Sequence, residues 1–536
     1  MSNNLLFLHV DSMTQNDLEF MFQHSDYFPG INKFKNNALI IEKMFGTGPT
    51  TEMVVPAMFS GELPLSDGGY EKGLENRKLN LISELKKKKY IIQFISGAYN
   101  YSSLYNFFSN EADTIHTWSI DLLWKSFQKN YLSNIYNLNL KNLDNLSYAK
   151  GTLIRHFDYL KKYVSKDNHF YTKYVLSIKG QKRKIIENNI SNHISLINED
   201  TLKYINLNKE KILKVSFSEF FYKKSLNERL VEFFNHLVWS GKKNEFPFMK
   251  LPIPNCFIET PSKQTSNKRI FNIINNIIKK ESTKNKAIIS SFYDIHNRNF
   301  SSNYLFKFWK PRNKFFEKKF KDVFEDKRRL LCLKYFDEQL SNFFNKNNNI
   351  LQDYTIVITS DHGSVFYKGE SPLNSTSLSG SFHDAYLSIP FVVFKKDLKP
   401  KRLDLLSSSI DIFPIISDIM NIKDKQLEVR GSSKILNGQK NEFIISEHAH
   451  RGACSLNLKE KIIYIGIRTN NFKYIKKFKS HPKDPKKNIN EILIDLKNDK
   501  LEKINLINDS TYLETINLFR KIYEKRIRDL GLNQLN

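Results

Sequence analysis

The chain has 536 residues, of which 40% are hydrophobic, and it carries a formal net charge of +27. Its lysines are spread along the chain among Asn and Ile rather than gathered in one arm, which argues against a nucleic-acid partner and leaves anionic small molecules as partners. The cysteines Cys256, Cys332 and Cys454 have no CxxC spacing and no even count, so the sequence supports neither a disulfide framework nor a zinc knuckle.

Strand-like apolar runs recur along the chain and alternate with helical patterns. The first run, residues 5–10, is ended by Asp11 and has no basic stretch before it, so it predicts a buried strand rather than a secretion signal. No window approaches about 18 uninterrupted apolar residues, and we therefore expect no transmembrane segment and a cytoplasmic protein. The later runs cover residues 38–45, 90–96, 287–293, 355–359 and 389–394. This alternation predicts an α/β fold with a mostly parallel central sheet and helices on both faces.

Helical patterns occupy two further places in the chain. Residues 326–345 have apolar side chains on one face of a helix, which we expect to pack on the sheet. Residues 120–250 are aromatic, rich in Lys and Asn and helical in period. They predict a helical insertion, which either caps the active-site side or forms a solvated appendage without a catalytic role.

The last part of the chain returns to strand patterns, followed by a helical tail through Arg528. The strand candidates cover residues 443–446, 462–468, 472–478 and 492–496. They predict a small C-terminal strand-rich subdomain. We thus divide the chain into a catalytic core at 1–119 and 251–440, an insertion at 120–250 and a C-terminal subdomain at 441–536.

Side chains that can carry out chemistry stand where predicted strands end. The run at 355–359 is followed by Asp361 and His362, and the first run is followed by Asp11. Ligands in open α/β sheets bind at the carboxyl ends of the strands, and Asp and His are common metal ligands. Between these segments, a Gly/Pro turn brings Thr50 and Thr51 to the start of an apolar helix-like segment. A metal-ligand pair, a remote carboxylate and a hydroxyl at a helix N-terminus indicate metal-assisted attack on a phosphate or sulfate ester.

In their number and order these segments resemble the sulfatase-like branch of the alkaline phosphatase superfamily. The resemblance extends over most of the chain apart from residues 120–250. Its landmarks are Asp11, the nucleophile turn at 51–61, and the segments at 293–296, 335–340, 359–363, His383 with 389–393, 411–414, 430–433, 467–474, 494–499 and 505–506.

One departure from true sulfatases points to a different ester. Those enzymes use a cysteine, converted to formylglycine, inside a Cys-x-Pro-x-Arg motif, whereas the aligned segment here is Thr51-Glu-Met-Val-Val55. The run from Thr51 to Ser60 is instead similar to the nucleophile turn of phosphoethanolamine transferases, which carry threonine at this position. We therefore expect phosphoryl-ester chemistry rather than sulfate hydrolysis by the formylglycine route.

A threonine hydroxyl is a poor nucleophile at neutral pH and needs a metal or an adjacent base. We expect a divalent cation, zinc with manganese as an option, held by Asp11, Thr51, Asp361 and His362. Attack by Thr51 would then give a covalent phospho-threonine, which water or an acceptor hydroxyl resolves.

Several assignments have alternatives. Thr50 competes with Thr51 as the nucleophile, although the spacing to Gly61 favours Thr51. The resemblance implies that His296 and His383 line the site, by gripping non-bridging oxygens or by completing a second metal position, and structural histidines are the alternative. The polar residues that either reach the site or lie on the surface are Lys368, His448, His450 and Arg451.

The sequence thus predicts a metal-dependent hydrolase or transferase of phosphate esters, and less of sulfate esters, that modifies a surface-polysaccharide precursor. Its substrate would be an anionic small molecule or saccharide. A catalytically silent sulfatase-like protein that binds glycans or anions is the alternative. Metal content separates the two, because a silent binder need not retain stoichiometric metal.

Overall fold

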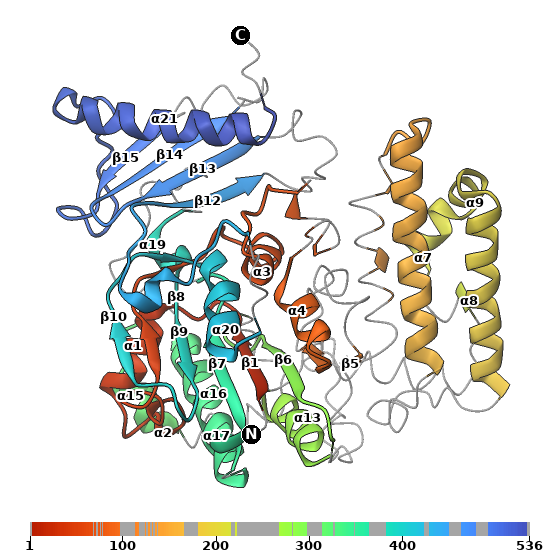
Figure 1. Cartoon of the computed structure of the whole chain (residues 1–536), viewed down its shortest axis with the longest axis horizontal. Coiled ribbons are helices and arrows are strands. Elements are labelled where there is room, and N and C mark those ends of the chain that lie inside the picture. The colour runs from red at the N-terminus through yellow and green to blue at the C-terminus, as the bar shows by residue number, and fades with distance from the viewer. Residues whose placement is uncertain are drawn as a thin grey trace, which may run out of the picture.

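The computed structural model describes residues 3–96, 113–165, 181–221, 267–296, 313–363, 382–422, 428–449, 462–478 and 491–532, with gaps inside these ranges at several residues of 68–78 and 117–137 and at 216–219, 281, 325–326 and 348. Figure 1 shows a central sheet covered by helices, a second sheet at the top and a group of helices to one side. Among the described helices, none is both long and apolar enough to cross a bilayer.

An eight-stranded sheet forms the centre, in the order β10-β2-β9-β7-β1-β6-β4-β5. Its strands are β1 (Asn4–Val10), β2 (Leu39–Ile41), β4 (Ile91–Ser96), β5 (Thr114–His116), β6 (Lys286–Phe292), β7 (Tyr354–Thr359), β9 (Phe391–Phe394) and β10 (Lys401–Leu403). Of these strands, β9 alone runs against its neighbours β7 and β2. The prediction of a mostly parallel central sheet is therefore confirmed.

Two predicted strand runs are broken in the structure. The run at 38–45 splits into β2 and β3 (Met44–Phe45), with the charged pair Glu42-Lys43 between them. The run at 389–394 splits at Pro390 into β8 (Ser388–Ile389) and β9, because proline cannot donate a ladder hydrogen bond. The short pieces β3 and β8 join β11 (Ser407–Ser408) in a separate three-stranded sheet.

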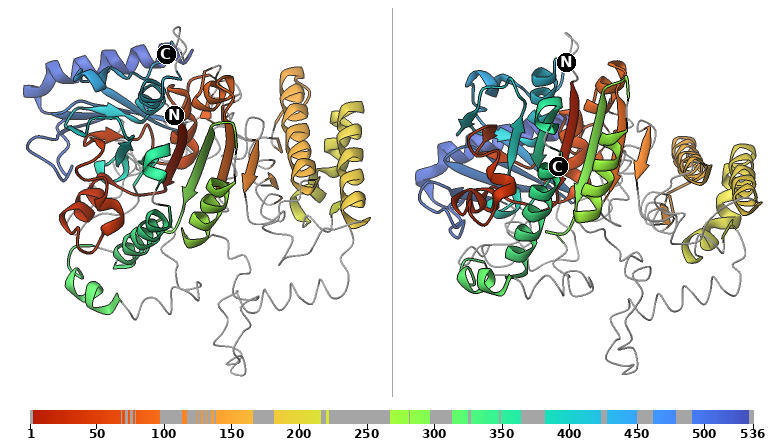
Figure 2. Two further views of the ribbon diagram at one scale, coloured as in Figure 1. Left: turned by 60° about the horizontal axis from the view of Figure 1, so that its bottom comes forward. Right: turned by 90° about the horizontal axis from the view of Figure 1, so that it is seen from below.

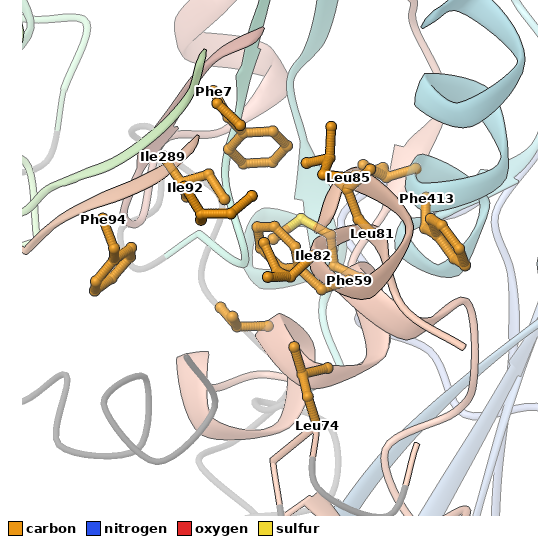
Figure 3. Close-up of a cluster of buried hydrophobic side chains, with 14 of the residues drawn as sticks. Phe7, Phe59, Leu74, Leu81, Ile82, Leu85, Ile92, Phe94, Ile289 and Phe413 are labelled. Carbon is orange, nitrogen blue, oxygen red and sulfur yellow. The ribbon is translucent and has the colours of Figure 1, made fainter. Parts of the chain in front are cut away.

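Both faces of the central sheet are apolar, so alternate residues of β1 enter two different cores. Leu5 and Phe7 join the cluster that includes side chains of α3 (Thr51–Ser60), α4 (Leu81–Lys87) and α20 (Ile412–Met420). In Figure 3, Phe7 lies near Phe59, and the two ring centroids are 5.2 Å apart. Full burial of such a side chain stabilises the fold by about 1.5–3 kcal/mol.

The opposite face is covered by a second set of helices. Leu6, Leu8 and Val10 join the cluster that includes side chains of these helices. They are α1 (Gln15–Gln23), α2 (Pro29–Asn32), α13 (Asn267–Lys279), α15 (Lys314–Lys319) and α16 (Lys327–Lys346). The last of them matches the amphipathic helix predicted at 326–345. Two short helices, α17 (Ile350–Asp353) and α19 (Asp384–Leu387), precede β7 and β8.

The predicted insertion contains α7 (Leu143–Ser165), α8 (Gln181–Glu199) and α9 (Thr201–Lys214). These helices lie to one side of the central sheet in both views of Figure 2. Aromatic rings pack between these helices; Phe157 on α7 and His193 on α8, for example, stack with ring centroids 5.5 Å apart. The helical nature of this region is confirmed for its described residues, whereas the exact borders of the three proposed parts stay a prediction.

The C-terminal part forms the predicted strand-rich unit. Its four strands are antiparallel and follow chain order: β12 (Ile444–Ala449), β13 (Ile463–Arg468), β14 (Phe472–Phe478) and β15 (Glu491–Asp495). Helix α21 (Leu513–Asp529) covers one face of this sheet, as Figure 1 shows. The rings of Tyr474 and Phe519 stack across this contact, with centroids 5.6 Å apart.

Candidate active site

The ends of neighbouring parallel strands bring the two predicted acids together. Strand β1 lies between β6 and β7, and His9 on β1 pairs with Thr359 on β7. Asp11 and Asp361 each follow two residues after that pair. Both carboxylates are buried, with exposed fractions of 1% and 0%. The 350 residues that separate them in sequence (361 − 11) therefore do not separate them at the edge of the sheet.

A turn with two tight glycines places Thr51 beside these acids. A β-carbon at Gly46 would lie 2.5 Å from the carbonyl oxygen of Asp361, and one at Gly48 would lie 2.8 Å from that of Glu447. Helix α3 then begins at Thr51. Its hydroxyl oxygen is 3.4 Å from Asp11 Oδ2. The N-terminal end of a helix favours an anion, so the start of α3 suits an ester phosphate.

His362 and His296 add two imidazoles to the site. One ligand atom each of Asp11, His296 and His362 can be chosen so that all three lie within 4.8 Å of one another. His362 Nδ1 is 2.6 Å from the Gly363 carbonyl oxygen, to which it donates. In the neutral ring, Nε2 then carries the lone pair that a cation can use, and this atom lies 3.4 Å from Thr51 Oγ1.

Electrostatics at the site favours positive charge. Burial alone would raise the pKa of the Asp361 carboxyl, but His362 and then His9 outweigh it and hold that pKa well below its usual range. Burial would lower the pKa of His362, yet Asp361 and Asp11 outweigh burial and raise it. The negative charge of the two buried carboxylates, Asp11 and Asp361, thus favours a cation or a protonated histidine beside them.

The residues present fit a divalent cation. Asp361 Oδ2 is buried and has no aligned hydrogen-bond donor among the described residues. It lies 3.5 Å from His362 Nε2. Buried polar atoms are normally hydrogen-bonded, so this oxygen marks a place for a ligand. Carboxylate oxygens together with imidazole nitrogens form the mixed donor set that zinc and manganese accept.

The structure distinguishes the two threonines. Thr51 contacts both Asp11 and His362 through its hydroxyl. Thr50 instead occupies the N-cap position of α3 without making a side-chain cap, and its hydroxyl oxygen is buried with no hydrogen-bond partner among the described residues. The geometry thus places the Thr51 hydroxyl beside Asp11 and His362, and its role as the nucleophile stays a prediction.

His383 is directed elsewhere by its observed contacts. It caps α19, where its Nδ1 accepts a hydrogen bond of 3.0 Å from the backbone N–H of Ala385. Its Nε2 lies 3.4 Å from the Leu501 carbonyl oxygen. Both nitrogens are thus occupied within α19 and the C-terminal part, and a catalytic role for His383 stays a prediction.

Of the four other polar candidates, the structure describes only His448. His448 lies on β12 and packs against Tyr464, with ring centroids 5.7 Å apart. Lys368, His450 and Arg451 lie outside the described residues. A role for any of these four residues at the site stays a prediction.

Two residues near the site were not identified from the sequence. His9 Nε2 lies 3.4 Å from Asp361 Oδ1. Arg329, on α16, donates from Nη2 to the carbonyl oxygen of Ser12 at 2.7 Å and from Nε to Asp17 at 3.1 Å. His9 had a signal, since it is a polar residue inside an apolar strand; Arg329 had none, because it stands among the charged residues that begin a surface-like helix.

Comparison with known proteins places the whole arrangement in one family. A family model described as sulfatase matches residues 3–422. None of the curated proteins matches the chain. Among solved structures, the chain is similar to a putative sulfatase from Bacteroides fragilis, at 13% identity and a TM-score of 0.50, over 99% of this chain and 96% of that one.

Two further solved structures share the fold. One comes from work on the metabolism of multiple glycosaminoglycans by Bacteroides thetaiotaomicron, at 12% identity and a TM-score of 0.53, over 99% of this chain and 97% of that one. The other was solved in complex with a neocarrahexaose, at 12% identity and a TM-score of 0.50, over 100% of this chain and 94% of that one. At such identities these likenesses show the fold alone.

Proposed function

Since the chain belongs to the sulfatase family of hydrolases, we propose that it cleaves or transfers phosphate esters in a metal-dependent reaction with Thr51 as the nucleophile. The observation that carries this proposal is the position of the Thr51 hydroxyl. It stands at the first residue of α3, 3.4 Å from both Asp11 Oδ2 and His362 Nε2. Reacting groups are often this loosely spaced before substrate binds.

Asp11, Asp361 and His362 are the residues that would hold the cation, with His296 as a further donor. When bound, zinc or manganese would lower the pKa of the Thr51 hydroxyl and offset the negative charge of the ester oxygens. The amide end of α3 adds a favourable field for the same oxygens.

The reaction then proceeds in two halves. The Thr51 hydroxyl donates toward Asp11 Oδ2, so this carboxylate is placed to receive the proton as the oxygen attacks phosphorus. The bond between Thr51 Oγ and phosphorus forms, the bond to the leaving oxygen breaks, and the leaving alcohol takes up the proton. Water, or an acceptor hydroxyl, then attacks phosphorus while the bond between phosphorus and Thr51 Oγ breaks. The proton of the attacking hydroxyl passes to Thr51 Oγ, which restores the threonine and gives hydrolysis or transfer respectively.

Phosphate is preferred over sulfate because residue 51 is threonine. The formylglycine route of sulfatases needs a cysteine at this position and an arginine four residues later, whereas this chain has Thr51 and Val55. Two proteins of the same fold come from work on glycans, and the saccharide substrate is proposed by analogy with them. We therefore propose a phosphodiester of a saccharide, such as a surface-polysaccharide precursor, as the substrate class.

A paired assay tests this function. Wild type, Thr51→Ala and Thr50→Ala are compared for cleavage of an aryl phosphodiester and an aryl sulfate with added zinc or manganese. We expect phosphodiester cleavage by wild type, its loss in Thr51→Ala and a milder effect of Thr50→Ala. Normal turnover by Thr51→Ala, or sulfate cleavage that clearly exceeds phosphodiester cleavage, would overturn the proposal. Absence of both activities together with absence of bound metal would favour the silent binding protein.

A further inference from the structure

A buried histidine, His9, stands behind the proposed metal ligands. It lies in β1 with an exposed fraction of 4%. Its Nδ1 is 3.2 Å from the hydroxyl oxygen of Ser291 on β6, and its Nε2 is 3.4 Å from Asp361 Oδ1 at the end of β7. Burial of an imidazole is costly unless its nitrogens have polar neighbours. His9 has one at hydrogen-bond distance from Nδ1 and a carboxylate at ion-pair distance from Nε2.

The strand pairing explains how His9 reaches both neighbours. His9 pairs with Ser291 on one side and with Thr359 on the other. Paired residues of parallel strands point to the same face, and so does the residue two positions further along. Figure 1 shows β7, β1 and β6 next to one another in the sheet. Ser291, His9 and Asp361 thus form a row across three strands.

The two oxygens of Asp361 have different surroundings. Oδ1 accepts from the backbone N–H of His362 at 2.9 Å and from the Ser360 hydroxyl at 3.3 Å, and it also faces His9. Oδ2 faces His362 Nε2, the nitrogen that lies beside Thr51, and has no aligned donor among the described residues. One oxygen is therefore held by the protein, while the other is left for a ligand.

We propose that His9 is a positioning residue, which holds Asp361 by one oxygen so that the other stays turned toward the cation. This role requires the Ser291 hydroxyl to donate to His9 Nδ1, so that the ring proton is on Nε2 and faces Asp361 Oδ1. Partners behind a metal ligand commonly fix its orientation in this way. The inference rests on the proposed function, because it takes Asp361 as a metal ligand.

Metal affinity of the full chain tests this role without relying on turnover. His9→Met removes both ring nitrogens but keeps an apolar side chain in the strand, whereas His9→Gln keeps an N–H donor near the position of Nε2. Ser291→Ala removes the group that fixes the ring proton. Ser290→Ala is the matched control, since Ser290 is equally buried on the same strand but donates to the Phe7 carbonyl oxygen.

Zinc and manganese affinities are measured by competition with a chromophoric chelator, with circular dichroism as the check of folding. We expect His9→Met to bind zinc about 10–100-fold more weakly than wild type. His9→Gln should recover most of the lost zinc affinity. Ser291→Ala should have an affinity between those of His9→Met and wild type, and Ser290→Ala should match wild type.

The outcomes separate this inference from the proposed function. Unchanged affinity in a folded His9→Met protein, or a His9→Gln protein as weak as His9→Met, would overturn the role of His9. If His9→Met does not fold, the comparison of Ser291→Ala with Ser290→Ala decides, and equal affinities would overturn it. Wild-type protein that binds neither zinc nor manganese would instead contradict the proposed function itself.

Discussion

Replacing Arg329 with methionine should strongly destabilise the catalytic core, because it leaves a buried carboxylate without its cation. Arg329 and Asp17 have side-chain exposed fractions of 0%, and they form an ion pair between α16 and α1. Arg329 also donates to the carbonyl oxygen of Ser12, the residue after Asp11. Breaking one partner of such a buried pair costs about 3–5 kcal/mol, and the unpaired carbonyl adds about 1 kcal/mol.

Arg402→Met is the matched control at the surface. Arg402 also pairs with two acids, Glu19 and Glu42, but its side chain is 37% exposed. Exposed ion pairs contribute about 0–1 kcal/mol, so this substitution should change stability little. The contrast between the two arginines isolates the effect of burial.

Urea unfolding, followed by near-ultraviolet circular dichroism, measures both effects. With a slope of about 3 kcal/mol per molar urea, the midpoint should fall by about 1 M or more in Arg329→Met and by about 0.3 M or less in Arg402→Met. Adding Asp17→Asn to Arg329→Met should recover part of the loss, because the buried charge is gone. Equal midpoint shifts for the two single variants would refute this reasoning.

Two further predictions concern the nucleophile turn and the helical insertion. Gly46→Ala should strongly reduce kcat/KM, because the added β-carbon would lie 2.5 Å from the Asp361 carbonyl oxygen and displace the turn that carries Thr51. Unchanged kcat/KM would contradict this. Burial lowers the pKa of His156 on α7 to about 4, below the value of about 6.5 in an unfolded chain. Between these two pKa values the unfolded state binds a proton at His156 and the folded state does not. The free energy of unfolding therefore falls as pH falls from about 6.5 toward 4, by on the order of 2 kcal/mol. The protection factors of α7 amides, which correct hydrogen exchange for the intrinsic rate at each pH, should fall over this range in wild type and fall less in His156→Gln; identical profiles of protection factor against pH would argue against the assignment.

The sequence could predict much of the site because the relevant signal is local. The apolar runs that become β1 and β7 are buried on both faces, so their ends, and the acids Asp11 and Asp361, could be read directly. Parallel strands bring such ends to one edge of the sheet. The glycines before Thr51 likewise predict a tight turn into a helix. The structure agrees, because Gly46 lies too close to the Asp361 carbonyl oxygen for a side chain to fit.

The remaining features depend on contacts between distant residues, which no local pattern encodes. The partners of Arg329 lie 312 and 317 positions away in sequence. The row from Ser291 through His9 to Asp361 exists only because β1 lies between β6 and β7. His383 follows the family order of landmarks, but the structure directs its nitrogens to Ala385 and Leu501, contacts that depend on how the C-terminal part docks.

Locating the covalent intermediate tests the central claim most directly. Wild-type protein is incubated with an aryl phosphodiester and zinc, denatured rapidly, and its peptides are mapped by mass spectrometry. We predict a phosphoryl adduct on Thr51, which is absent without metal and absent from Thr51→Ala but present in Thr50→Ala. An adduct on Thr50, or on any residue other than Thr51, would contradict the proposed mechanism.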